Sequence, residues 1–200
     1  MSDRENALMI FVKNPVAGRV KTRLAKDIGD EKALKVYQQL LYITKKICDE
    51  VNACRQVWYS EEIEHGDLWE SDNYSKYKQQ GKGLGRRMKY AFEQIFERDF
   101  RKAVIIGSDC ALLKPHHIED AFRNLETHDV VIGPSRDGGY YLLGMRRFIP
   151  QLFEGKAWST SDVLEQTLSD CETLGLSTAV LETLNDVDTK EDWKQVRDLL

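Results

Sequence analysis

Short runs dominated by apolar residues recur along the chain and predict buried β-strands. These runs cover residues 8–12, 56–59, 103–107, 129–133, 140–145 and 177–181. Between most of them lie longer stretches in which apolar residues return every three or four positions, the spacing of one face of an amphipathic helix. The predicted helices cover residues 30–51, 84–100, 115–125, 162–173 and 190–200. Residues 60–73 are acidic and irregular, and we expect them at the surface.

The order of these elements indicates the fold class. Strands and helices alternate through residues 8–133, and this alternation predicts an α/β fold with a mainly parallel sheet. A length of 200 residues suits one domain, and neither an internal repeat nor a linker divides the chain. We therefore expect one domain that spans residues 1–200, with ligands bound near the carboxyl ends of its central strands.

A basic segment without acidic residues follows the first predicted strand. Its cations are Lys13, Arg19, Lys21, Arg23 and Lys26. No acid occurs between Glu5 and Asp27, although the whole chain has a net charge of −4. Two interpretations remain open: a solvated basic face, or a loop whose N–H groups and cations bind phosphates. The segment does not match a Walker-type P-loop, because Pro15 and Val20 stand where that motif needs glycines.

Three acidic residues lie at the ends of predicted elements. Asp109 follows the apolar run 103–107, a place where α/β sheets bind ligands. Asp186 and Asp188 are two residues apart, so an extended segment places both carboxylates on one side. Carboxylate oxygens suit Mg²⁺ or Mn²⁺. The alternative is capping of the last helix by Asp188 or Thr189, and the spacing alone does not decide between the two.

Two further segments combine small, hydroxyl-bearing and aromatic residues. They contain Asp137, Gly138, Gly139 and Tyr140 in the first segment, and Trp158, Ser159 and Thr160 in the second. The glycines of the first segment allow a ligand to approach the backbone closely, but the same residues suit a hairpin turn. The hydroxyls of the second segment suit the polar groups of a ligand, or an ST-turn before the next helix, or both.

Composition excludes several classes of protein. A hydrophobic share of 42% and a charged share of 31% are typical of a globular rather than a disordered chain. The net charge of −4 argues against broad nucleic-acid binding. No apolar run approaches the roughly 18 residues that a membrane span needs. The polar start, MSDRENA, has no signal-peptide pattern and the four cysteines form no C-x-x-C pair, so we expect a cytoplasmic protein with reduced thiols.

The basic segment, KNPVAGRVKTRL, resembles the signature loop of the nucleotide-diphospho-sugar transferase superfamily, whose members have the GT-A fold. Within it, the chain most resembles the bacterial, glycosyltransferase-like DUF2064 group. That group is similar to the guanylyltransferases of deazaflavin and molybdopterin cofactor synthesis. Other stretches carry the resemblance too: Q-x-G-x-LG-x-RM, G-S-D, G-P-x-x-D-G-G-Y-Y, W-S-T and D-V-D-T. One departure is Ala111, which stands where the group usually has a proline after G-S-D.

The resemblance implies a fold and a set of site residues. The fold is a three-layer α/β/α sandwich with a mixed, mainly parallel sheet. The implied nucleotide-binding residues are Lys13, Gly18, Arg19, Lys21, Arg23, Gln80 and Gly83, and the catalytic residues among the candidates are Lys21 and Asp109. The implied ligands of Mg²⁺ or Mn²⁺ are Asp109, Asp186 and Asp188. The implied acceptor-binding residues are Asp137, Gly138, Gly139, Tyr140, Trp158, Ser159 and Thr160.

The same resemblance implies a metal-dependent transferase. Its partners would be a nucleotide or nucleotide sugar and a small-molecule acceptor, with neither nucleic acid nor a membrane. Nucleotidyl transfer to a small phosphorylated acceptor, with release of pyrophosphate, fits the basic segment and D-V-D-T best. Glycosyl transfer from a nucleotide-diphospho-sugar is the first alternative, and a non-catalytic nucleotide-binding module is the second. The sequence predicts neither the acceptor, nor the nucleobase, nor the oligomeric state.

Overall fold

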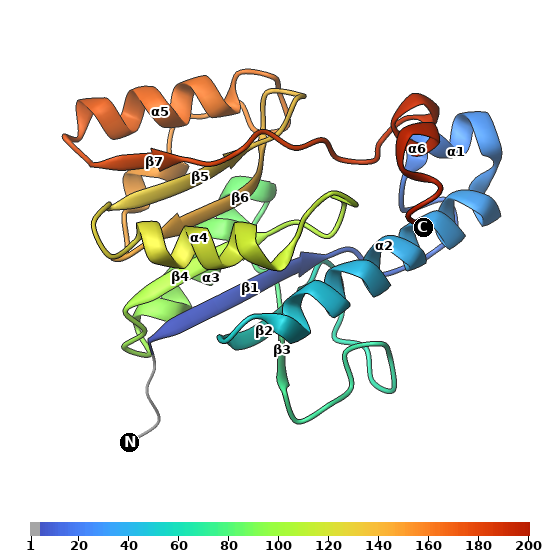
Figure 1. Cartoon of the computed structure of the whole chain (residues 1–200), viewed down its shortest axis with the longest axis horizontal. Helices are drawn as coiled ribbons and strands as arrows, with labels where there is room; N and C mark the ends of the chain where they lie inside the picture. Colours follow the sequence, from blue (N-terminus) through green and yellow to red (C-terminus); the bar gives the residue numbers. More distant parts are fainter. Residues whose placement is uncertain (1–4) are drawn as a thin grey trace.

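The computed structural model describes residues 5–200 and contains one sheet of seven strands (Figure 1). The strands are β1 (Asn6–Val12), β2 (Cys54–Tyr59), β3 (Tyr74–Lys78), β4 (Lys102–Ile106), β5 (Val130–Pro134), β6 (Tyr140–Met145) and β7 (Thr178–Val180). Their order across the sheet is β3-β2-β1-β4-β6-β5-β7. Strand β6 runs antiparallel to β4 and β5, and the other neighbours are parallel. The predicted mixed, mainly parallel sheet is therefore confirmed.

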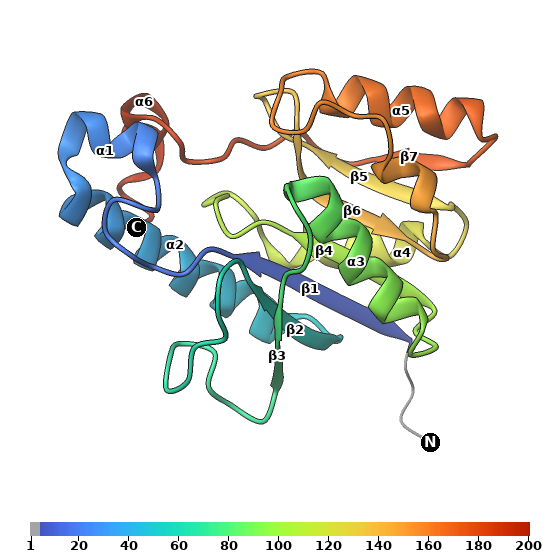
Figure 2. The same cartoon turned by 180° about the vertical axis from the view of Figure 1, so that it is seen from behind.

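Helices cover both faces of the sheet and complete the predicted three layers (Figure 1). The helices of the described residues are α1 (Thr22–Ile28), α2 (Asp30–Glu50), α3 (Leu84–Phe96), α4 (Pro115–Asn124), α5 (Val163–Thr173), α6 (Lys190–Val196) and the 3₁₀ helix η1 (Pro150–Phe153), and all but α1 and α6 pack on the sheet. Helices α2 and α4 pack on the face that receives Leu8, Ile10 and Val12 of β1. Helices α3 and α5 pack on the opposite face, which receives Ala7 and Met9 and is turned forward in Figure 2. This alternation is the two-residue period of a strand buried on both sides.

A third apolar cluster lies beyond the carboxyl end of β1 and joins distant parts of the chain. Leu24 of α1 and Val36 of α2 pack there with Val187 and with Val196 of α6. Figure 1 and Figure 2 both show α1 and α6 side by side. Because Val187 is buried in this cluster, its neighbours Asp186 and Asp188 are held close to the start of α1.

Some elements differ from the sequence prediction. Helix α1 was not predicted, because it begins inside the basic segment and its N-cap residue makes no side-chain cap. Strand β3 was not predicted either, because YSKYK holds two tyrosines among three polar residues and no continuous apolar run, as suits the edge of a sheet. Helix α3 ends at Phe96 rather than at residue 100, since Asp99 turns the chain with a φ of 61°. Helix α6 ends at Val196 rather than at residue 200.

The structure also bears on the predicted location of the protein. No helix within residues 5–200 is long and apolar enough to cross a membrane. Residues 1–4, part of the polar start on which the signal-peptide prediction rests, lie outside the described residues. The cysteines are free thiols, and of the four Cys54 is exposed.

Hydrogen bonds to Asp129 connect the start of β5 to the segment before β7. The Asp129 carboxylate accepts hydrogen bonds from the backbone N–H of Ser177 at 3.1 Å, from the Ser177 hydroxyl at 2.8 Å and from the Arg146 guanidinium at 2.9 Å. Burial works to raise the pKa of Asp129, but the bonds from Ser177 and Arg146 outweigh it and lower the pKa to about 2. The ionised carboxylate is thus part of what holds β5 and β7 together.

Asp129→Asn is expected to lose about 1.5–3 kcal/mol of unfolding free energy at pH 7, since a charged acceptor is replaced by a neutral one. A lowered carboxyl pKa stabilises the folded state above the unfolded pKa of about 4, and that contribution disappears as the pH falls through the folded pKa. Urea unfolding should therefore show the difference from wild type shrinking as the pH falls from about 4 to about 2. Asp120→Asn is the control, because its ion pair with Arg123 is exposed and is expected to contribute less than about 1 kcal/mol. Equal losses in both variants would contradict the role of Asp129.

Candidate active site

The candidate site begins with a hydroxyl that ties together the ends of two central strands. Strands β1 and β4 are adjacent and parallel, so Lys13 and Ser108 lie at the same edge of the sheet. The hydroxyl of Tyr37, on α2, accepts a hydrogen bond from the N–H of Lys13 at 2.8 Å and donates one to its carbonyl at 3.1 Å. It also lies 3.1 Å from the hydroxyl of Ser108. Burial and the charge of Asp109 raise the pKa of Tyr37, so the hydroxyl stays protonated.

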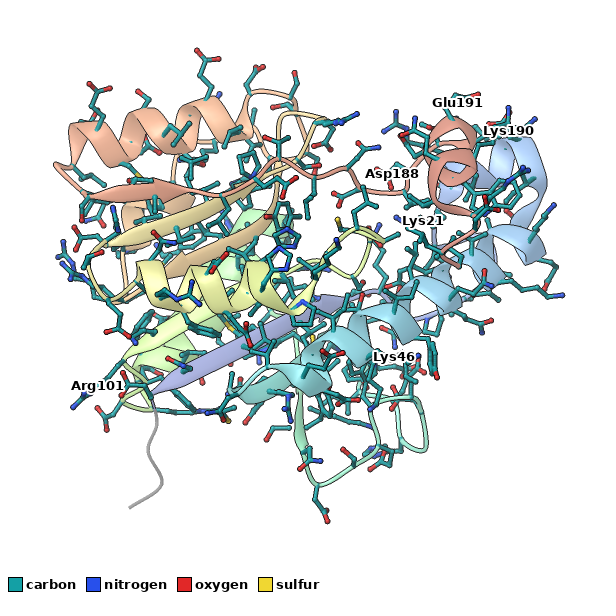
Figure 3. The ribbon with its side chains drawn as sticks, in the orientation of Figure 1. Lys21, Lys46, Arg101, Asp188, Lys190 and Glu191 are labelled. Carbon is teal, nitrogen blue, oxygen red and sulfur yellow. The ribbon has the colours of Figure 1, made fainter. Side chains whose placement is uncertain are left out.

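Lys21 lies between two of the predicted metal ligands. Its ammonium nitrogen is 3.0 Å from Oδ1 of Asp109 and 3.0 Å from Oδ1 of Asp188, and 3% of its side chain is exposed. Burial alone would lower the pKa of Lys21, but the two carboxylates outweigh burial and raise it. The side chain is therefore a buried cation at neutral pH, and Figure 3 shows it directed toward Asp188.

Several of the predicted cations line one small cavity of about 110 Å³, which we call the Lys21 cavity. Its polar lining consists of Lys13, Lys21, Thr22, Arg23, Asp109 and Asp188, besides Tyr37. The guanidinium of Arg23 is 3.9 Å from Oδ2 of Asp188, and 68% of that arginine side chain is exposed. The cavity thus combines cations that suit phosphate groups with carboxylates that suit a metal ion.

A second cavity, of about 540 Å³, adjoins the first and is called the Trp158 cavity. Of the predicted acceptor-binding residues, its lining includes Asp137, Gly139, Tyr140, Trp158, Ser159 and Thr160. The carboxylate of Asp186 lines it too, and Arg23 and Asp188 belong to both cavities. Gly138 is not in the lining; its φ of +87° places it where a Cβ would lie 2.0 Å from the Ser161 carbonyl oxygen.

In the D-V-D-T segment, the residue that caps α6 differs from the two residues predicted to bind a metal ion. Thr189 is the N-cap of α6: its hydroxyl accepts from the N–H of Asp192 at 3.2 Å, and its own N–H donates to the Asp192 carboxylate at 2.8 Å. The side chains of Asp186 and Asp188 take no part in this cap. Burial and the nearby charge of Asp109 raise the pKa of Asp186 to about 7, although Lys21 acts in the opposite direction. Nearby negative charge therefore disfavours the ionised form of the Asp186 carboxyl group.

Other predicted nucleotide-binding residues lie outside the linings of these two cavities. Arg19 is exposed and forms an ion pair with Glu61 at 2.9 Å. Gly18 has a φ of +75° in the loop before α1. Gln80 is exposed, and Gly83 is the N-cap residue of α3 with a φ of +82°. Of the predicted cations, Lys13, Lys21 and Arg23 therefore come together and Arg19 does not, whereas Gln80 and Gly83 lie just before α3 and Gly18 lies before α1.

Residues 43–160 match the family described as "Uncharacterized protein conserved in bacteria (DUF2064)". The chain belongs to the DUF2064 family. It is also similar to a crystal structure from Desulfovibrio desulfuricans G20 named "putative nucleotide-diphospho-sugar transferase", with 32% identity, a TM-score of 0.86, and coverage of 94% of this chain and 84% of that one.

A curated relative of this DUF2064 protein has a named activity. The 2-phospho-L-lactate guanylyltransferase of Methanocaldococcus jannaschii is 31% identical over 128 residues, which are 64% of this chain and 54% of the relative. The chain therefore spans about half the length of that relative. The fold is shared more widely: the inositol-1-phosphate CTP transferase of T. maritima has a TM-score of 0.61 at 14% identity, over 98% of this chain and 95% of that one.

The donor set of this DUF2064 chain fits a divalent cation in chemistry, because Asp109, Asp186 and Asp188 offer only oxygen ligands. The raised pKa of Asp186 indicates negative charge that a dication would compensate. Within residues 5–200, however, no group of three or more His, Cys, Asp or Glu side chains is gathered so as to hold a metal ion. The ammonium of Lys21 occupies the space between Asp109 and Asp188 instead.

Sequence reasoning missed some residues of the site. Tyr37 reads as a core position of an amphipathic helix, and nothing local indicates that its hydroxyl contacts Lys13. Leu84 and Ser161 also line the Trp158 cavity. Each directly follows a predicted site residue in the sequence, and this adjacency was the signal that could have identified them. Backbone strain is a further signal that only the structure provides: Lys21 and Ser159 line these cavities with φ values of 49° and 65°.

Gly85 allows Trp158 to reach its place in the Trp158 cavity. A Cβ at Gly85 would lie 2.1 Å from Cε2 and Nε1 of the Trp158 indole. Alanine normally stabilises a helix relative to glycine by up to about 1 kcal/mol. Here Gly85→Ala is instead expected to destabilise by about 1–3 kcal/mol, because the indole must move. Thermal unfolding and the indole N–H resonance of Trp158 would measure both effects, with Arg86→Ala on the same helix as control; an unshifted resonance in Gly85→Ala would contradict the close contact.

Proposed function

We propose that this protein transfers a nucleotidyl group from a nucleoside triphosphate to a small phosphorylated acceptor and releases pyrophosphate. The observation that carries the proposal is the junction of the Lys21 cavity and the Trp158 cavity at Arg23 and Asp188. The Lys21 cavity offers cations to a triphosphate, and the Trp158 cavity offers about 540 Å³ to a second substrate beside it. Transfer between two substrates requires two adjoining sites of this kind.

The atoms of the reaction balance without a protein nucleophile. An oxygen of the acceptor phosphate attacks the α-phosphorus, the bond from that phosphorus to the α,β-bridging oxygen breaks, and pyrophosphate leaves with the electron pair. Lys13, Lys21 and Arg23 hold the phosphates and neutralise the charge that develops on the leaving group. Asp109, Asp186 and Asp188 would hold Mg²⁺ or Mn²⁺, which supplies further neutralisation when bound. Asp137, Trp158 and their neighbours face the acceptor.

The activity of a similar protein supports nucleotidyl rather than glycosyl transfer. The Methanocaldococcus jannaschii relative is named a 2-phospho-L-lactate guanylyltransferase, so GTP and phosphorylated 2-hydroxy acids are the first substrates to test. The name of the Desulfovibrio desulfuricans structure favours the alternative, transfer from a nucleotide-diphospho-sugar. A binding module without turnover would use the same cavities, and the second substrate-sized cavity argues against it.

Pyrophosphate release distinguishes these functions. Purified protein would be incubated with each of the four common nucleoside triphosphates, with Mg²⁺ or Mn²⁺, and with a panel of phosphorylated 2-hydroxy acids and sugar phosphates. We expect acceptor-dependent release of pyrophosphate with at least one pair. Acceptor-dependent release of a nucleoside diphosphate from a nucleotide sugar would favour glycosyl transfer instead. Nucleotide-induced thermal stabilisation without any product would favour the binding module.

A further inference from the structure

A third, apolar cavity of about 90 Å³ adjoins the candidate active site. Its lining includes Phe11, Leu84, Met88, Ile105 and Leu143, and we call it the Phe11 cavity. It lies between α3 and the ends of β1, β4 and β6. The Phe11 cavity shares Leu84 and Tyr140 with the Trp158 cavity, whereas it shares no lining residue with the Lys21 cavity. The Phe11 cavity thus adjoins the Trp158 cavity rather than the Lys21 cavity.

The absence of a side chain at Gly107 helps to keep this cavity open. Gly107 is exposed and lines the cavity directly after β4. A Cβ built there would have no heavy atom within 4 Å, and the φ of Gly107 is not in the left-handed region. The backbone therefore does not require glycine at this position, and a larger side chain would enter free space rather than strain the fold. Leu84, which lines both this cavity and the Trp158 cavity, has 43% of its surface exposed.

The chemistry of the Phe11 cavity suits an apolar group and not a nucleobase. The ring of Tyr141 packs in the cluster on the α2 and α4 face, where its hydroxyl donates to the carbonyl of Glu182 at 3.1 Å, so that hydroxyl offers no polar group to the cavity on the α3 face. The edge of a nucleobase carries several donors and acceptors, and burying them without partners is costly. A cavity of about 150 Å³ with a comparable apolar lining holds benzene, so about 90 Å³ suits a group of roughly three or four carbons.

We infer that the Phe11 cavity is a specificity subsite for a short apolar group on the acceptor whose phosphate lies in the Trp158 cavity. The inference rests on the proposed function and narrows its substrate class to phosphorylated acceptors with an unbranched apolar end of up to three or four carbons. Leu84 and Tyr140 line both cavities, so an acceptor that reaches from one cavity to the other would contact these two side chains.

Binding of n-alkyl monophosphates tests the inference without a known acceptor. Methyl, ethyl, propyl and butyl phosphate would be titrated into the full-length protein and followed by ligand-observed NMR. For wild type we expect the affinity to rise about fourfold with each added methylene until the cavity is full. Gly107→Val fills the cavity, so its affinity is expected to stay the same along the series, and Gly107→Ala should give an intermediate slope. Melting temperatures would verify that both variants are folded.

Several outcomes would overturn the inference. They are no binding of any alkyl phosphate, equal affinity along the series in wild type, and an undiminished slope in folded Gly107→Val. Loss of nucleoside triphosphate affinity in Gly107→Val, with the alkyl slope unchanged, would assign the cavity to the nucleotide instead. Failure of the proposed function looks different: the slope and its loss in Gly107→Val would be observed, but no triphosphate would yield pyrophosphate.

Discussion

Lys21→Met is expected to lose roughly 2–3 kcal/mol of unfolding free energy in metal-free buffer and to regain part of it when Mg²⁺ is added. The ammonium of Lys21 is 3.0 Å from carboxylates of both Asp109 and Asp188. Methionine keeps the unbranched apolar stem of the side chain but leaves the two carboxylates facing each other without a cation. Removal of one partner from a buried ion pair costs about 3–5 kcal/mol, and we expect less because 31% of the Asp109 and 39% of the Asp188 side chain is exposed.

Recovery with Mg²⁺ is the specific part of this prediction. A dication can take the place of the ammonium between Asp109 and Asp188, and binding to the folded state alone stabilises it by mass action. Urea unfolding with EDTA and with Mg²⁺ would measure the effect. Arg19→Met is the matched control, because that arginine is exposed and, among residues 5–200, forms an ion pair with Glu61 alone; the loss of stability should stay below about 1 kcal/mol and should not respond to Mg²⁺.

Nucleotide affinity gives a second measurement on the same variant. If Lys21 also contacts a phosphate, Lys21→Met should bind the nucleotide that stabilises wild type at least about tenfold more weakly, the equivalent of roughly 1.5 kcal/mol for a charged hydrogen bond. Unchanged affinity together with lost stability would mean that Lys21 serves to hold Asp109 and Asp188 and not to bind phosphate. In that case Lys13 and Arg23 would remain as the phosphate contacts of the Lys21 cavity.

The fold was largely predictable because its signals are local. Burial on the two faces of the sheet produces the apolar runs of β1 and β4 and the periodic apolar faces of α2 and α3. The spacing of apolar residues in the sequence therefore shows which positions are buried. Strand β3 escaped prediction because an edge strand needs no continuous apolar run. The cap of α6 was predictable as well, since Thr189 and Asp192 form a local T-x-x-D pattern of the capping-box type.

The roles within the candidate site were less predictable because they depend on contacts between distant residues. Arg19 and Arg23 belong to one basic segment, yet the first pairs with Glu61 and the second lines both cavities. Lys21 meets Asp188, which follows it by 167 residues, and only the packing of α1 against α6 creates that pair. The sequence pattern selects candidate cations and carboxylates, whereas which of them lie close together is a property of the tertiary structure.

Asp186→Asn is expected to stabilise the protein in metal-free buffer at pH 8 while lowering turnover by roughly 100-fold. Burial and the charge of Asp109 raise the pKa of Asp186 to about 7, well above the unfolded value of about 4. A raised carboxyl pKa leaves stability unaffected below about pH 4, lowers it between about pH 4 and 7, and imposes the full cost above about pH 7. The neutral amide removes that cost, so its stabilising effect should be largest at pH 8 and should vanish near pH 4.

Asp188→Asn completes the test, because it separates metal or substrate binding from helix capping. The variant loses its partners Lys21 and Arg23 but leaves the Thr189 cap intact, so we expect a modest loss of stability, about 1 kcal/mol, and a loss of turnover as large as that of Asp186→Asn. Thr189→Ala is the opposite control: it removes the cap, costs about 1 kcal/mol and should keep most of the activity. Urea unfolding and pyrophosphate release would be measured on all three variants. If Asp186→Asn and Asp188→Asn kept full turnover while Thr189→Ala lost it, the segment would act on the site through the position of α6, and its carboxylates would not be ligands.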